Sequence, residues 1–255
     1  MSEAIQATVH VDCADWQGQL QRIWASIGYD EMPQFIKDAV VAAENRSFWT
    51  DSGIDPKGIV RALLNNASSD TQQGASTITQ QYVKLFYLTT ERSYTRKVKE
   101  AITALKIEAV YSKSEILETY LNTVPFGRGA YGIEAAAETY FNTTADQLNL
   151  FQAAFLAGLP QAPGIYDIFS NRDATLFRNK QVLVSMYEVS KEKNCIYVST
   201  IPDRICVSAQ DAADAYIASD SYPFVQRANP MIYPHWVTYI RYLLETKYDA
   251  QTIYR

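Results

Sequence analysis

The stretch EMPQFIKDAVVAAENRSFWTDSGID, residues 31–55, sets the fold class of this 255-residue chain. Its apolar side chains recur three and four residues apart, which is the spacing of one buried face of an α-helix; they are Met32, Phe35, Ile36, Ala39, Val40 and Ala43. The stretch then turns polar and reaches Gly53, a residue typical of a helix stop. The sequence predicts a buried helix that ends near Glu44.

Similar patterns along the rest of the chain predict a mainly α-helical protein with little β structure. We expect helices from about residues 56 and 78, over 96–111 and 116–122, from about 133, and over 146–159, 172–188 and 234–248. Segment 124–132, VPFGRGAYG, is predicted as a loop because it holds a proline and three glycines. Only residues 195–199 are typical of a strand.

The composition allows a sizeable core, since 47% of the residues are hydrophobic, and it excludes some partners and sites. The 23 Lys and Arg are outnumbered by 28 Asp and Glu, which argues against a nucleic-acid partner. No apolar run approaches the ~20 residues needed to cross a bilayer. Cys13, Cys195 and Cys206 are odd in number and lack C-x-x-C spacing, so they favour neither a zinc site nor a disulfide framework. The sequence leaves open whether Cys195 and Cys206 pair with each other.

Glu44 is the first candidate for chemistry. It stands where the apolar helix ends and Phe48 and Trp49 follow. Partial burial beside these rings would raise the pKa of the carboxyl group, as in a general acid or base. The alternative is an ordinary solvated glutamate at a helix end.

Two polar clusters follow. Residues 74–84, GASTITQQYVK, place hydroxyls and amides at a helix start, which suits a sugar or an anion; the alternative is a well-capped helix. Next, Lys84, Arg92, Arg96, Lys97 and Lys99 lie within sixteen residues. Arg96 shares a helix face with Glu100 at i, i+4, which suits a pyrophosphate beside an acid/base group. A surface charge run is the competing interpretation.

We interpret residues 113–122, KSEILETYLN, mainly as a structural segment without a direct catalytic role. Their apolar positions predict a buried face, which leaves Glu118 and Asn122 on a polar side. We expect these two side chains to brace the loop 124–132 through hydrogen bonds.

Five segments, taken in order, resemble the motifs of family 51 glycosyltransferases: ENRSFWTDSGID, GASTITQQYVK, RSYTRKVKE, KSEILETYLN and LAGLPQAP. These are the peptidoglycan glycosyltransferases of class A penicillin-binding proteins and of monofunctional transglycosylases. The resemblance implies a lysozyme-like helical fold with a larger lobe and a small membrane-apposed lobe. It also implies polymerisation of lipid II into β-1,4 strands, with inverting displacement of undecaprenyl pyrophosphate.

By this resemblance Glu44 is the base and Glu100 the second carboxylate. The implied substrate-binding residues are Ser76, Thr77, Gln80, Gln81, Lys84, Arg92, Arg96, Lys97 and Asn122. No cofactor is required, although Mg²⁺ or Mn²⁺ at the pyrophosphate is compatible with the chemistry, and no metal-ligand cage is visible.

The first motif keeps Phe48 and Gly53 and departs from the family at two places. Asn45 replaces an aspartate, and Asp51 replaces a histidine. We expect the Asp51 charge to raise the pKa of Glu44 and so to shift the pH optimum. The other interpretations are a non-catalytic scaffold that binds lipid II or the cell wall, and a lytic murein-cleaving enzyme of the same fold.

The resemblance also predicts the organisation of the chain. Residues 1–28 are expected to be a leader that follows a missing membrane anchor, 29–205 the glycosyltransferase domain, and 206–255 a linker toward an absent transpeptidase domain. The expected partners are lipid II, the growing glycan strand, the bacterial membrane surface and cell-wall synthesis proteins. The location would be the outer face of the cytoplasmic membrane. Leu63, Leu64, Phe86, Tyr87 and Leu88 are candidates for an apolar membrane patch or for core.

Overall fold

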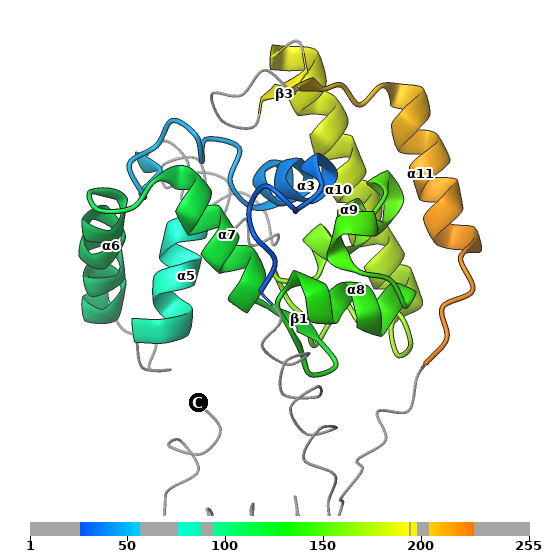
Figure 1. The fold of residues 1–255 in the computed structure, drawn as a ribbon, viewed down its shortest axis with the longest axis horizontal. Helices are drawn as coiled ribbons and strands as arrows, with labels where there is room; N and C mark the ends of the chain where they lie inside the picture. Colours follow the sequence, from blue (N-terminus) through cyan, green and yellow to red (C-terminus); the bar gives the residue numbers. More distant parts are fainter. Residues whose placement is uncertain (1–25, 57–75, 88–93, 194, 198–203, 227–255) are drawn as a thin grey trace, which may run out of the picture. The chain divides into compact units, whose positions relative to one another are not determined.

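A computed structural model describes residues 26–56, 76–87, 94–193, 195–197 and 204–226 (Figure 1). Residues 1–224 form one compact unit and residues 225–255 a second one. The helices of the described part are α3 (Gln34–Glu44), α5 (Ile78–Tyr87), α6 (Tyr94–Glu108), α7 (Lys113–Thr123), α8 (Ile133–Phe141), α9 (Leu150–Gly158), α10 (Arg172–Lys193) and α11 (Ala209–Ser221), with a 3-10 turn at Ala145–Gln147. The prediction of a mainly α-helical fold with little β structure is confirmed.

The helix α3 is the centre of the larger group of helices. It packs against α9 and α10, and α11 covers another side of α10. Ile36, Ala39 and Val40 are fully buried, which confirms the predicted apolar face of this helix.

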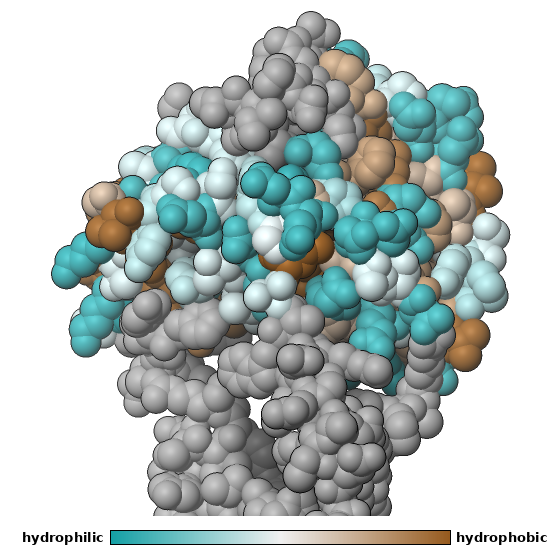
Figure 2. Space-filling view, viewed as in Figure 1, coloured by the Kyte–Doolittle hydropathy of each residue, from teal (hydrophilic) through white to brown (hydrophobic). Residues whose placement is uncertain are grey.

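The helices α5, α6 and α7 form a smaller group, in which α5 contacts both α6 and α7. The larger group begins on the other side of α7, which contacts α8. The face seen in Figure 2 is mostly hydrophilic over α7 and α8, because these helices turn their apolar side chains inward.

Helix starts follow local capping chemistry. Ser112 begins α7 with a capping box: its hydroxyl accepts from Glu115 N, and the Glu115 carboxylate accepts from Ser112 N at 2.7 Å. Asn149 and Gln152 form the same arrangement at the start of α9. The single helix predicted over 146–159 is therefore wrong at its start, because the Asn149 cap separates α9 from the short 3-10 turn.

Segment 124–132, predicted as a loop, contains a small antiparallel hairpin of β1 (Pro125–Gly127) and β2 (Ala130–Tyr131). Its turn uses positive φ angles at Gly127, Arg128 and Gly129, which glycine adopts without strain. A second hairpin pairs β3 (Ile196–Tyr197) with β4 (Arg204–Ile205). The strand β3 lies within the strand predicted at 195–199, whereas β4, which is only two residues long, was not predicted.

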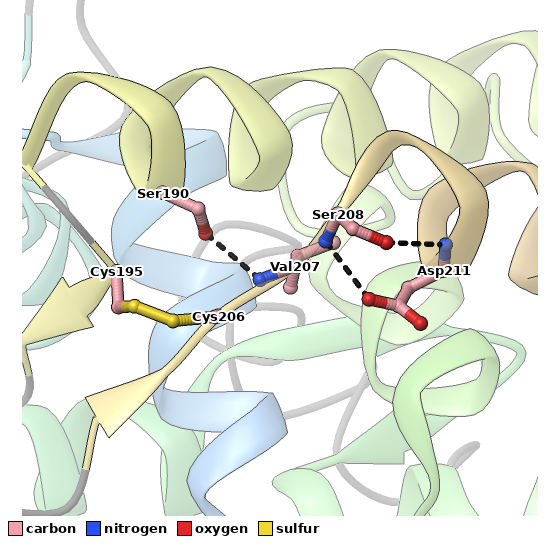
Figure 3. The surroundings of a disulfide bond; sticks show 6 residues. All are labelled: Ser190, Cys195, Cys206, Val207, Ser208 and Asp211. Atoms are coloured by element: carbon pink, nitrogen blue, oxygen red, sulfur yellow. Dashed lines mark hydrogen bonds between the residues drawn. A yellow bond between two sulfur atoms is a disulfide. The ribbon is translucent and has the colours of Figure 1, made fainter.

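The pairing of Cys195 with Cys206, which the sequence leaves open, is answered by the structure, because a disulfide joins the two residues (Figure 3). It closes the second hairpin, and Val207 N donates to the Ser190 hydroxyl of α10 at 3.0 Å beside it. Residues 206–224, predicted as part of a linker, thus belong to the compact unit, since α11 packs on α10 and α9.

Some sequence predictions lie outside the described residues. They concern the helices predicted from residue 56 and over 234–248, most of the leader, Arg92, Leu63, Leu64 and Leu88, and the side chains of Phe86 and Tyr87. Among the described residues, no helix has both the length and the apolar character that crossing a membrane would require.

Candidate active site

Glu44 is the last residue of α3, and its carboxylate is held from two sides. Arg178 of α10 places its Nη2 atom 3.0 Å from Oε1, and Gln81 of α5 donates from Nε2 to Oε2 at 2.8 Å. Only 7% of the Glu44 side chain is exposed. A single carboxylate thus bridges the larger and smaller groups of helices.

A second layer of hydrogen bonds fixes these two partners. The Tyr120 hydroxyl of α7 donates to Gln81 Oε1 at 2.8 Å, and Arg178 Nε donates to the Gly158 carbonyl at the end of α9 at 3.3 Å. Burial, together with the negative charge of Glu44, raises the pKa of Tyr120 well above its usual range. Tyr120 therefore remains a neutral donor that orients Gln81.

Burial also raises the pKa of Glu44, while the Arg178 charge and the hydrogen bonds from Gln81 and Arg178 act in the opposite direction. The predicted raised pKa is confirmed in direction. The cause expected first, burial, is confirmed as well, whereas the further contribution expected from the charge of Asp51 is wrong. Asp51 instead forms an ion pair with Lys113 at 3.0 Å and accepts a hydrogen bond from Asn45 Nδ2 at 2.9 Å.

Glu100 is buried on α6, with 2% of its side chain exposed, and lies between two cations of its own helix. Arg96 Nη1 is 3.7 Å from Oε2, which confirms the i, i+4 pair predicted from the sequence, and Lys97 binds the other oxygen. Lys97 also donates to the Ser76 hydroxyl at 2.8 Å, just before α5 begins.

The two carboxylates therefore both lie near the start of α5, Glu44 bound to Gln81 within this helix and Glu100 linked through Lys97 to Ser76 just before it. The cations differ in access to solvent. Lys84 is exposed and the Lys97 side chain is 45% exposed, whereas Arg96 is largely covered. The lysines can thus reach a ligand without giving up a buried site.

Thr77 and Gln80 are buried and use their polar atoms within the protein. The Thr77 hydroxyl donates to the Gly53 carbonyl at 2.7 Å, and the Gln80 side chain accepts from Thr77 N at 3.1 Å. The Gln80 contact is that of a capping box at the start of α5, whereas the Thr77 hydroxyl joins this helix start to the turn that follows Glu44. Their role in substrate binding stays a prediction.

Glu118 and Asn122 brace a different segment from the one predicted. Asn122 forms a pair of 3.0 Å hydrogen bonds with the backbone N–H and carbonyl of Ile27, and Glu118 accepts from Tyr29 N at 3.1 Å. The expectation that they hold the loop 124–132 is wrong, because their polar side faces the chain that leads into α3.

Arg178 is the site residue that the sequence analysis missed. It lies 134 residues from Glu44, so no local pattern connects the two. One signal was present: Arg178 is four residues before the buried Val182, on an apolar helix face where a lone arginine requires a partner. No cluster of three or more His, Cys, Asp or Glu in the described segments could hold a metal ion.

The geometry defines a class of protein: a helical domain with one buried carboxylate held between an arginine and a glutamine, and a second buried carboxylate beside two cations of its own helix. The sequence profile of the family described as Transglycosylase matches residues 12–187. Because this match covers more than half of the chain, the protein belongs to the transglycosylase family, and with it to the peptidoglycan glycosyltransferases that its five motifs resemble.

The chain is similar to several penicillin-binding proteins. Penicillin-binding protein 1A of Neisseria flavescens is 45% identical over 172 residues, which are 67% of this chain and 21% of that protein. Penicillin-binding protein 1A of Aquifex aeolicus is 46% identical over 172 residues, 67% of this chain and 23% of that protein. A crystal structure of penicillin-binding protein 1A from Haemophilus influenzae aligns over 88% of this chain and 21% of that one, with 21% identity and a TM-score of 0.41. The chain spans about a fifth of the length of these relatives.

Proposed function

We propose that this chain polymerises lipid II into β-1,4-linked glycan strands, with Glu44 as the base. The observation that carries the proposal is the buried Glu44 carboxylate between Arg178 and Gln81. The family supports glycosyl transfer to peptidoglycan, and this carboxylate supplies a group suited to remove the proton that the transfer releases.

In the proposed step, the 4-hydroxyl oxygen of one lipid II attacks the anomeric carbon of the growing chain. The bond from that carbon to the pyrophosphate oxygen breaks, and Glu44 takes the hydroxyl proton. The α-linked donor becomes a β-linked product, so the displacement inverts the anomeric carbon. The raised pKa of Glu44 suits this role, because a base works best when its pKa lies near the working pH.

The leaving undecaprenyl pyrophosphate carries negative charge, for which Lys97, Lys84 and Arg96 are the proposed partners. Glu100 holds Arg96 and Lys97 close together, so that two cations can meet the pyrophosphate. A Mg²⁺ or Mn²⁺ ion bound to the pyrophosphate oxygens would add to this stabilisation. We also propose the bacterial membrane surface as the place of reaction, on its outer face. The Cys195–Cys206 disulfide favours such an oxidising location.

Two alternatives are weighed by the same site. A lytic enzyme expels a neutral glycan and needs no cations beside its second carboxylate, so the Arg96–Glu100–Lys97 arrangement disfavours it. The alternative of a non-catalytic scaffold rests on Asn45 and Asp51, which depart from the family motif. Both side chains form hydrogen bonds that hold the turn after Glu44, so their presence gives no support for a loss of activity.

The test is glycan-chain formation from purified lipid II in detergent by the wild-type chain and by Glu44→Gln. We expect polymer from the wild type and a loss of at least ~1,000-fold in the variant, because the amide cannot accept the proton. Cleavage of intact sacculi would select the lytic enzyme, and lipid II binding without product would select the scaffold.

A further inference from the structure

The turn after Glu44 is closed on one side chain, Asp51. Its Oδ2 atom accepts from Asn45 Nδ2 at 2.9 Å, and the Ser47 hydroxyl lies 3.1 Å from the same oxygen. Its Oδ1 atom accepts from Gly53 N at 3.0 Å and lies 3.0 Å from Lys113 Nζ. Asp51 therefore holds residues 45–53 together, and among its contacts in the described part of the chain only the one with Lys113 leads out of the turn. The turn has further outside contacts through Arg46 and the Gly53 carbonyl.

Lys113 opens α7 and neutralises two buried carboxylates at once. Besides Asp51, its Nζ atom lies 2.7 Å from Glu108 Oε1 at the end of α6. The Asp51 and Glu108 side chains are only 6% and 7% exposed. The ammonium group also lies 4.6 Å from the centre of the Phe48 ring, a cation–π contact within the same turn.

The same cluster also contacts α5, the helix whose Gln81 binds the Glu44 carboxylate. The Thr79 hydroxyl of α5 donates to Glu108 Oε1 at 2.5 Å, and the Thr77 hydroxyl binds the Gly53 carbonyl. Gln81, the partner of Glu44, follows two residues after Thr79 on α5. The cluster thus fixes both the residue that follows Glu44 and the helix that supplies its hydrogen-bond donor.

We propose that Lys113 is a positioning residue for glycosyl transfer: its ammonium group joins the turn 45–53 to α5 and α6, and so sets where the Glu44 carboxylate lies. This inference rests on the proposed function. Without Lys113, two buried carboxylates would face each other with no cation between them, and such a pair separates. The turn would move away from α6, and Glu44 would lose its alignment with Gln81.

Lys113 forms ion pairs with two carboxylates, Asp51 and Glu108, so the proposal can be tested by changing how many charges remain in this cluster. Lys113→Met should leave two facing anions, whereas the double variant Asp51→Asn/Lys113→Met leaves one. We expect Lys113→Met to lower kcat for lipid II polymerisation about 10- to 100-fold with KM changed less than about twofold. Lys113→Arg and the double variant should recover most of the loss. Lys191→Met, an exposed lysine of α10, is the matched control and should retain wild-type rates.

A second readout does not depend on activity. In a carboxyl-carbon NMR titration, with the Glu44 signal assigned by Glu44→Gln, Lys113→Met should lower the Glu44 pKa toward its ordinary value as the carboxylate leaves its buried place. The double variant should restore the wild-type titration. If Lys113→Met does not fold, an active and folded double variant supports the same conclusion.

The proposal is overturned if Lys113→Met keeps kcat within about twofold of the wild type and leaves the Glu44 titration unmoved, or if the double variant is no better than Lys113→Met. If the wild-type chain makes no polymer, that result contradicts the proposed function and not the positioning role of Lys113. The NMR titration would then decide the positioning role alone.

Discussion

The two carboxylates of the site are both buried, yet they are held in opposite ways. Glu100 obtains its cations from its own helix, three and four residues away. Glu44 obtains its single cation from α10, far along the chain, and its hydrogen bond from α5. The difference teaches that the local pair can be a preassembled anion-binding unit, whereas the long-range pair exists only once the larger group of helices has packed.

After the loss of Glu44 itself, the largest effect should come from Arg178→Met, which breaks the long-range pair. We expect kcat/KM to fall about 100-fold, because a buried carboxylate loses its only ion-pair partner in the described structure. The Arg178 charge lowers the Glu44 pKa, so removing it raises that pKa. The base must be deprotonated, so the acidic limb of the pH–rate profile should move to higher pH.

The matched control for this change is Arg178→Lys, which keeps the charge. It should hold the acidic limb near its wild-type position but recover only part of the rate, since lysine cannot also reach the Gly158 carbonyl with a second N–H. An unmoved limb in Arg178→Met would show that the arginine does not act on the base.

The local pair can be probed with Lys97→Met. We expect KM for lipid II to rise about 10-fold with a smaller change in kcat, because a charge-assisted bond to the pyrophosphate is lost. The pH–rate profile should keep its shape. Lys106→Met removes an exposed lysine from the same helix and should behave as the wild type; an equal effect of both variants would reduce the cluster to a surface charge run.

The disulfide tests whether the larger group needs a covalent closure beside α10, the helix that carries Arg178. Cys195→Ser/Cys206→Ser should lower the free energy of unfolding by about 2–3 kcal/mol, since the reduced chain has more freedom when unfolded. Urea unfolding of the variant and the wild type measures this. Polymerisation at 25 °C should change less than about twofold, and a collapse of activity would mean that the hairpin shapes the site.

Asp38 gives an internal contrast to Glu44, because it is a buried carboxyl of the same helix that has no arginine partner in the described residues. Burial raises its pKa to about 8, and one of its oxygens has no hydrogen-bond partner among those residues. Ionisation of Asp38 therefore lowers the free energy of unfolding. The stability that the neutral carboxyl group allows is fully present below about pH 4 and is lost as the pH rises through 8.

Asp38→Asn should remove this pH dependence. We expect the variant to gain about 1–3 kcal/mol of unfolding free energy over the wild type above pH 8 and little below pH 4. Thermal unfolding across this range measures it, with activity at neutral pH serving as the functional check. Parallel stability curves for the two proteins would rule out an ionising Asp38.

The parts of the site that depend on the spacing of nearby residues could be predicted from the sequence. The apolar period of residues 32–43 predicts α3 and places Glu44 at its end, and the Arg96–Glu100 spacing predicts the second pair. The sequence also placed a helix start within residues 74–84, where α5 begins. These features depend on residues three or four apart, where helix geometry alone decides which side chains meet.

The long-range contacts could not be predicted in the same way. The bonds of Arg178 to Glu44, of Lys113 to Asp51 and of Asn122 to Ile27 join residues 62 to 134 positions apart, and only the packing of the helices brings them together. The Cys195–Cys206 pair stayed open in the sequence, because an odd cysteine count does not show whether two of the three residues form a bridge. Asp51 shows the cost of reasoning by proximity in sequence: it is seven positions from Glu44, but it faces Lys113.

The most direct test of the assignment is the pH–rate profile of lipid II polymerisation by Glu100→Gln beside that of the wild type. If Glu44 is the base, the variant polymerises more slowly but keeps the same acidic limb. Disappearance of that limb in Glu100→Gln would assign the proton transfer to the second carboxylate and contradict the account.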